Sequence, residues 1–256
     1  MIKYYKYEEF YIMSGHSKWN NIKRKKGAND AARAKIFTKI GREMSVIVKA
    51  GGPDPNSNSK LRDCIAKAKS LNVPNDNIER IIKKASGAGN TDNYEETLYE
   101  GYGPCGVAVV VECLTDNRNR TAGEMRHYFD KFGGNMGTPG SVMFMFNRRG
   151  YIAINAEGLS EDEVMDAALE CGASDFAAND GVFEIITEPN DVGAVREALE
   201  QRGYTCETAE PEYYPSTFTS ITDEDAMKNM QKLLDALDDN EDVQNVWHNL
   251  DNLPEE

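Results

Sequence analysis

The sequence predicts an α+β multidomain protein: an N-terminal three-helix domain followed by two α+β domains, the last ferredoxin-like and inserted in the second. Two changes along the chain predict this organisation. Up to about residue 87, apolar residues recur at the three- and four-residue spacing of helices, whereas later they also form short strand-like runs. The charge changes at the same place, from 17 Lys/Arg against 6 Asp/Glu in 14–90 to 10 against 35 in 91–256.

The basic part is expected to form three helices, at about 30–49, 57–70 and 74–86. Asn29 or Asp30 can cap the first helix, because a short side-chain oxygen accepts from the free N–H groups of a first turn. Pro74 suits the opening of the third helix, and Gly87 ends it. Cations on the first helix are expected to fall on one stripe beside the apolar face: Lys35, Lys39, Arg42 and Lys49.

Strands and helices alternate after the turn-rich stretch at 87–93. The β-α-β-β-α-β order from Tyr151 to Glu212 is typical of a ferredoxin-like unit, and Asn179-Asp180-Gly181 favours a tight hairpin between its central strands. The expected strands are 107–114, 141–147, 151–154, 175–178, 182–187, 204–212, 216–221 and 243–249, and the expected helices are 121–132, 160–171, 191–202 and 222–237.

These elements divide the chain into four parts. We expect an extension at 1–13, a basic helical domain at 14–90, an α+β domain built from 91–148 and 213–253, and an inserted ferredoxin-like domain at 149–212. The extension precedes Met13 and is expected to be a disordered tail or the product of an upstream start.

The composition argues against several functional classes. No apolar run approaches the roughly 18 residues that a membrane helix needs, and the first twelve residues resemble neither a signal peptide nor a transit peptide. The five cysteines and three histidines show no metal-ligand spacing. The glycine-rich stretches at 100–106 and 133–140 lack the lysine of a phosphate-binding loop and are expected to be tight turns. We therefore expect a cytoplasmic protein with no cofactor and no catalytic site.

The net charge of +11 over residues 14–90 predicts a domain that binds nucleic acid. Cations neutralise phosphates and release counterions, while Trp19 and His16 offer flat surfaces on which unpaired bases can stack. The residues expected to bind in this part are His16, Lys18, Trp19, Lys23, Arg24, Lys25, Lys26, Arg33, Lys35, Lys39 and Arg42. The alternative is a dipolar protein that docks its basic half on its own acidic half.

A second candidate contact is the Asp116-Asn-Arg-Asn-Arg-Thr121 turn between a strand and a helix. Arg118 and Arg120 would project there from a helix N-terminus, a place suited to an anion, with Thr121 as the cap. The alternative is turn chemistry without a ligand. Both readings stay open at this point.

Several long motifs resemble the YebC/PmpR family in order and spacing, over nearly the whole chain from Ser14 to about Leu253. They are SGHSKWNNIKRKKGANDAARAKIFTKIGREM, YEGYGPCG, ECLTDNRNRT, FGGNMGTPGSVMFMF and DVQNVWHNLD. The resemblance implies three domains, the third inserted in the second. It also places His16, Trp19 and the N-terminal cations in the binding N-terminus, and Arg118 and Arg120 in a loop of the second domain. The family usually has glycine where this chain has Cys105.

The resemblance implies a regulator of gene expression, described in bacteria as a DNA-binding transcriptional regulator. Mitochondrial relatives are described as translational activators, and bacterial ones are linked to ribosomes stalled at proline-rich sequence. Two physical observations favour this alternative of an RNA- or ribosome-binding translation factor. The link expected at 51–56, between the first two helices, is longer than the three- or four-residue turn of a helix-turn-helix, so that motif is disfavoured. The net −25 after residue 90 would also repel a long duplex. A protein-interaction scaffold would bind neither polymer.

Overall fold

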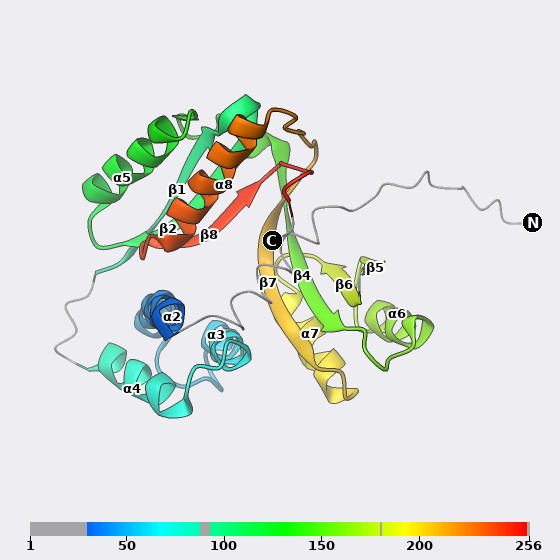
Figure 1. The fold of residues 1–256 in the computed structure, drawn as a ribbon. Coiled ribbons are helices and arrows are strands. Elements are labelled where there is room, and N and C mark those ends of the chain that lie inside the picture. Colours follow the sequence, from blue (N-terminus) through cyan, green and yellow to red (C-terminus); the bar gives the residue numbers. More distant parts are fainter. Residues whose placement is uncertain (1–29, 88–92, 180, 255–256) are drawn as a thin grey trace, which may run out of the picture.

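The computed structural model describes residues 30–87, 93–179 and 181–254. Their elements form three groups (Figure 1): a helical unit at the lower left, sheet A with two helices above it, and sheet B with two helices to the right. The predicted α+β organisation with an N-terminal helical part is confirmed. Among the described residues, no helix is long and apolar enough to cross a membrane.

The helical unit contains α2 (Asp30–Gly51), α3 (Ser59–Ser70) and α4 (Asn75–Ser86). All three helices were predicted, although α3 begins two residues later than expected. Asn58 explains that start, because its Oδ1 accepts from the Leu61 N–H at 3.1 Å while its Nδ2 donates to the Gly52 carbonyl at 2.9 Å. One side chain therefore caps α3 and ties it to the end of α2. The core of the unit is formed by Ile40, Met44, Val48, Leu61, Cys64, Ala68, Val73, Ile78 and Ala85.

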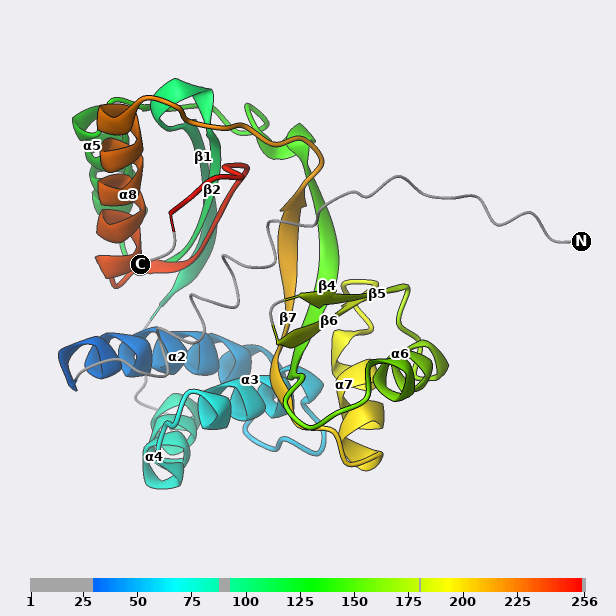
Figure 2. The same cartoon turned by 45° about the vertical axis from the view of Figure 1, so that its right-hand side comes forward.

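Sheet A has the strand order β3-β1-β2-β8 and is antiparallel. Its strands are β1 (Glu95–Tyr102), β2 (Ala108–Thr115), β3 (Asn135–Met136) and β8 (Val243–His248). Helices α5 (Arg118–Lys131) and α8 (Glu224–Asp239) cover the same face (Figure 2). Alternate residues of β2 pack under these helices, with Val109, Val111 and Cys113 fully buried against Phe129 and Leu233. Period-two burial of this kind fixes the register of the strand.

Sheet B has the order β5-β6-β4-β7, and all its pairs are antiparallel. Its elements are β4 (Phe146–Asn155), α6 (Glu161–Glu170), β5 (Asp175–Asn179), β6 (Val182–Thr187), α7 (Val192–Gln201) and β7 (Cys206–Pro215). Numbered along the chain, these strands lie in the order 2-3-1-4 with a helix after the first and third, which is the ferredoxin-like arrangement. The expected hairpin is also present, since Asn179 pairs with Val182.

Strands β4 and β7 join the two sheets. They pair from Phe146 with Pro215 at one end to Ile154 with Cys206 at the other. At the first end they lie against the face of sheet A that carries no helix, where the Tyr213 and Trp247 rings meet edge to face at 4.9 Å between centroids. Both strands therefore run through the expected domain boundaries at 148 and 212.

Three sequence expectations for strands need correction. Strand β1 was not predicted, because its alternation is interrupted by Glu100 and glycine. In place of the two expected strands at 141–147 and 151–154, the single strand β4 begins at Phe146 and follows a short 3₁₀ turn, η2 (Met143–Met145). The Glu100 carboxylate causes this difference, since it accepts from the N–H groups of Gly140, Val142 and Met143 at 2.6–2.9 Å and removes them from any ladder.

The third correction is the expected strand at 216–221, which forms only an isolated bridge between Thr219 and Leu250. Its amides are bonded elsewhere: the Ile221 N–H donates to the Asn252 side chain at 3.0 Å, and the Ser216 N–H donates to the Met145 carbonyl at 2.7 Å. The segment is therefore a connection from β7 to α8 and adds no strand to either sheet.

Candidate nucleic-acid interface

The structure describes six of the candidate binding residues. They are Arg33, Lys35, Lys39, Arg42, Arg118 and Arg120. The other seven lie outside the described residues: His16, Lys18, Trp19, Lys23, Arg24, Lys25 and Lys26.

Three of the described cations on α2 face the end of α8. We call Lys35, Lys39 and Arg42 the basic stripe, and Asp238, Asp239, Glu241 and Asp242 the acidic corner. Lys35 Nζ lies 2.6 Å from an Asp239 carboxylate oxygen. Lys39 Nζ donates to the backbone carbonyl of Asp238 at 2.6 Å and lies 3.7 Å from its carboxylate. The Arg42 guanidinium binds Glu241 and Asp242. Three of the four residues of the predicted stripe are therefore engaged by this corner, while the fourth, Lys49, is exposed near the end of α2.

The last turn of α8 explains why the acidic corner attracts cations. A helix C-terminus carries a partial negative charge from unpaired carbonyls, and α8 ends with two aspartates and no basic residue. The helix cannot balance this charge by itself. Lys35 and Lys39, four residues apart on α2, supply the missing cations from another part of the chain.

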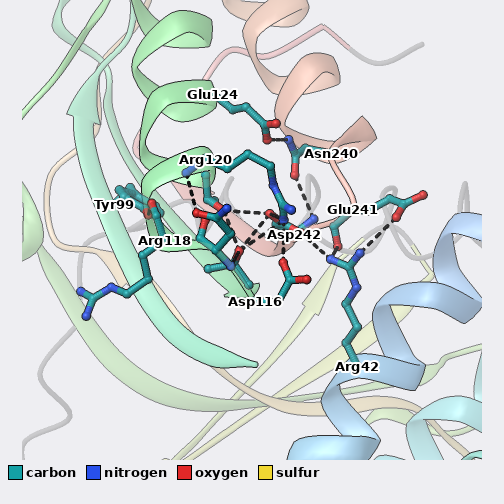
Figure 3. Close-up of polar contacts among 12 residues, drawn as sticks. Arg42, Tyr99, Asp116, Arg118, Arg120, Glu124, Asn240, Glu241 and Asp242 are labelled. Carbon is teal, nitrogen blue, oxygen red and sulfur yellow. Dashed lines mark hydrogen bonds and ion pairs between the residues drawn. The ribbon is translucent and has the colours of Figure 1, made fainter. Parts of the chain in front are cut away.

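Asp242 is the centre of the contact (Figure 3). One carboxylate oxygen accepts from Arg42, and the other accepts from Arg120 at 2.6 Å and from the Thr121 hydroxyl at 2.7 Å. The Thr115 hydroxyl donates to the same oxygen at 3.1 Å. Burial of Asp242 opposes its ionisation, but the hydrogen bonds from Arg120, Thr121 and Arg42 outweigh this effect and lower the pKa of the carboxyl. Asp242 is therefore a carboxylate at neutral pH.

The structure separates the two arginines of the 116–121 turn. Arg120 bridges Asp242 and Asp116, so it holds the turn against β8. Arg118 points away from this cluster in Figure 3; its side chain is 65% exposed and its Nη1 lies 3.8 Å from a Glu95 carboxylate oxygen. The cap of α5 is Asn117, whose side chain accepts from the Arg120 N–H, and the expected cap Thr121 is instead a buried partner of Asp242.

Cations of α3 hold the helical unit to sheet B. Arg62 Nε lies 2.6 Å from Glu197 of α7, and Lys67 Nζ lies 3.2 Å from Glu210 of β7 and 3.1 Å from Glu43 of α2. In the reverse direction, Arg196 of α7 binds Asp63 at 2.9 Å. The helical unit thus makes ion pairs with both α+β parts of the chain.

Exposed cations of α4 form a surface that lies outside the candidate binding residues. Arg80, Lys83 and Lys84 are exposed, while Ile78 on the opposite face is buried. The amphipathic spacing of the third helix was the signal that could have identified this surface. α4 also corrects the expectation about helix-turn-helix geometry, because only residues 71–74 separate it from α3. Asn72 adopts the left-handed φ of 60°, which lets the chain turn within four residues.

The glycine-rich stretches are tight turns only in part, because 100–102 end strand β1 and 135–136 form strand β3. A side chain on Gly134 would place a Cβ 2.3 Å from the Tyr102 carbonyl oxygen, and one on Gly101 would place it 2.7 Å from that of Asn135. These glycines allow β1 and β3 to approach closely. In the part of the chain that the structure describes, no three His, Cys, Asp or Glu residues are grouped as metal ligands would be.

Comparisons with known proteins place these features in a family. The TACO1/YebC protein N-terminal domain matches residues 17–88, and the TACO1/YebC second and third domain matches residues 94–250. The chain belongs to the TACO1/YebC family. This confirms the resemblance seen in its motifs.

TACO1/YebC relatives match almost end to end. A protein named "Probable transcriptional regulatory protein" from Acetivibrio thermocellus is 59% identical over 93% of this chain and 98% of its own length. A protein of the same name from Finegoldia magna is 55% identical over 94% of this chain and 100% of its own. A crystal structure of a conserved hypothetical protein, Aq1575, from Aquifex aeolicus superposes with a TM-score of 0.80 at 44% identity, over 89% of this chain and 93% of that one.

Proposed function

We propose that this protein is a non-enzymatic regulator of gene expression, and that its basic N-terminal part binds nucleic acid. The names of its curated relatives support a regulatory role. The charge of the chain supports the binding, because residues 14–90 carry a net +11 beside a body of net −25.

The observation that carries the proposal is the α3–turn–α4 pair with its exposed cations. A four-residue turn between two helices is the spacing of helix-turn-helix proteins, whose second helix enters the major groove. Here the second helix, α4, buries Ile78 and presents Arg80 and Lys83 to solvent. Such a helix can make phosphate contacts at the edge of a groove without disturbing its own core. The basic segment at 14–26 would then make additional contacts along the backbone.

An RNA or ribosomal target is the second candidate function. The acidic body favours it, since net −25 over residues 91–256 opposes the approach of a long duplex, whereas a folded RNA can present a short phosphate-rich surface to the helical unit alone. Co-sedimentation with ribosomes, set against footprinting on promoter DNA, would separate the two candidates.

The test of binding uses the full chain. Its affinity for a duplex DNA and for a structured RNA is measured at several salt concentrations, together with a variant that combines Arg80→Ala and Lys83→Ala. Losing two phosphate contacts should reduce the salt slope by about 2 and the affinity by about tenfold. Lys228→Ala with Lys232→Ala on α8 removes the same charge from the acidic body and should change little. A wild-type chain that binds neither polymer at low salt would refute the proposal and leave a protein-interaction scaffold.

A further inference from the structure

We propose that the basic stripe of α2 is a nucleic-acid contact that the acidic corner of α8 occupies in the free protein. Phosphates and the acidic corner then compete for Lys35, Lys39 and Arg42, so that the chain carries its own competitor. This inference rests on the proposed function and adds a form of regulation to it.

The chemistry of the contact supports competition. Lysine and arginine side chains bind phosphate oxygens through the same charge-assisted hydrogen bonds that they make with carboxylates. In the acidic corner, carboxylates of Asp239 and Asp242 lie against Lys35 and Arg42, while a helix-terminal carbonyl accepts from Lys39. The corner therefore presents several anionic oxygens to neighbouring cations, as a nucleic-acid backbone does.

The two ends of the contact between the basic stripe and the acidic corner differ in how exposed their side chains are. At its outer end, the Lys35 and Asp239 side chains are 42% and 73% exposed. At its inner end, those of Arg42 and Asp242 are 16% and 5% exposed. Exposed ion pairs are weak and screened by salt, so an arriving polyanion would displace Asp239 from Lys35 first. Only a ligand with several phosphates would then reach Arg42.

The separate anchoring of the helical unit makes such an exchange feasible. Arg62 and Lys67 hold α3 to α7 and β7 on a different side of the helical unit. Releasing the basic stripe from α8 would leave those pairs in place. The helical unit would therefore remain attached to the rest of the chain when nucleic acid occupies the stripe.

The experiment weakens the competitor and leaves the stripe intact. A full-length variant with Asp238→Asn and Asp239→Asn is compared with wild type in binding to the same duplex DNA and structured RNA. The matched control carries Asp162→Asn and Asp166→Asn. Both aspartates are exposed on helix α6, far along the chain from the acidic corner, and the two substitutions remove the same charge. If the free protein is partly closed, its apparent affinity is reduced by the closed fraction. The variant should bind about two- to tenfold more tightly than wild type and than the control.

A second readout reports the contact without nucleic acid. Acylation of Lys35, followed by mass spectrometry, should be faster in the Asp238→Asn, Asp239→Asn variant and unchanged in the control. Saturating nucleic acid should protect Lys35 in both variants and in wild type.

Each outcome decides between the two proposals. If wild type binds and the acidic-corner variant binds equally, or if the control gains as much, the competition is refuted while the proposed function stands. If neither protein binds, the proposed function fails, and this inference fails with it. Binding by the variant where wild type shows none would support competition in its strongest form.

Discussion

The guanidinium of Arg42 donates to the carboxylate of Asp242, a residue 200 positions further along the chain. The same carboxylate also accepts from Arg120, so one buried acid connects α2, the 116–121 turn and the start of β8. The charge asymmetry of the chain allowed either nucleic-acid binding or docking of the basic half on the acidic half. The ion pairs between α2 and the end of α8 give this docking a defined geometry. It is compatible with nucleic-acid binding because the α4 cations lie outside this contact.

Asp242→Asn should destabilise the protein by about 3 kcal/mol, because it leaves two cationic partners around a neutral amide. The loss should depend on pH. Since the folded-state pKa of Asp242 is below the ordinary aspartate value, its contribution is complete above the unfolded-state pKa of about 3.9 and is lost as the pH falls through the folded-state value. Urea unfolding of both proteins between neutral pH and strongly acidic pH measures this. A difference that stays constant down to the acid limit would contradict the linkage.

Replacing Lys23, Arg24, Lys25 and Lys26 with alanine should abolish most binding to nucleic acid. Four cations are lost, and each phosphate contact contributes about one unit of salt slope. Lys23→Arg with Lys25→Arg and Lys26→Arg preserves the charge and should preserve the affinity. Filter binding at two salt concentrations is sufficient. Full affinity in the alanine variant would show that residues 23–26 are not part of the interface and would leave α4 as the proposed contact.

Arg118→Ala and Arg120→Ala should have different effects. Arg120 donates to Asp242 and Asp116, so Arg120→Ala should reduce stability by about 1–2 kcal/mol. Arg118 is largely exposed, so Arg118→Ala should leave stability within about 0.5 kcal/mol of wild type and weaken nucleic-acid binding by a small, measurable amount. Thermal unfolding and titration of both variants test this. Unchanged binding by Arg118→Ala would leave the loop with structural roles only.

Cys105→Gly should stabilise the protein by about 0.5–1 kcal/mol. Cys105 has a φ of 56° and a ψ of 20°, a left-handed conformation that costs a side chain about 1–2 kcal/mol, partly offset by the greater freedom of glycine in the unfolded chain. Asn72→Gly is the matched control, because Asn72 has a φ of 60° and asparagine tolerates that region. Its stability should change less. A destabilised Cys105→Gly protein would show that the thiol makes a contact of its own.

The sequence predicts a helix or strand well where the residues of that element alone determine its structure. The apolar period placed all three helices of the helical unit, and the order of elements predicted the ferredoxin-like sheet. Errors arose where side chains far apart in sequence decide the backbone. Glu100 binds the amides of Gly140, Val142 and Met143 and prevents a strand there, and no local pattern marks that partnership.

The candidate site also has features that the local sequence predicts and features that depend on residues far apart in the chain. The sign and place of the charges were readable from residue counts, and so was the stripe on α2. Which cations are already paired was not readable, since Lys35 and Asp239 lie 204 positions apart. Charge alone therefore identified a surface, whereas tertiary structure divides its cations into those paired within the chain and those left exposed, such as Arg80 and Lys83.

Because β4 and β7 are continuous across the boundaries at 148 and 212, the inserted region is not a separable module. In sequence, 149–212 looks like a module that could be removed between two flanking segments. In the fold, those two strands are a single antiparallel ribbon. The start of β4 and the end of β7 lie against sheet A, and the other end of the ribbon forms the middle and edge of sheet B. Cutting at 148 and 212 would shorten both strands and leave the Phe146 and Tyr213 side chains on frayed ends. The two sheets are therefore continuous through this ribbon, and 149–212 cannot be cut out without breaking strands that also contact sheet A.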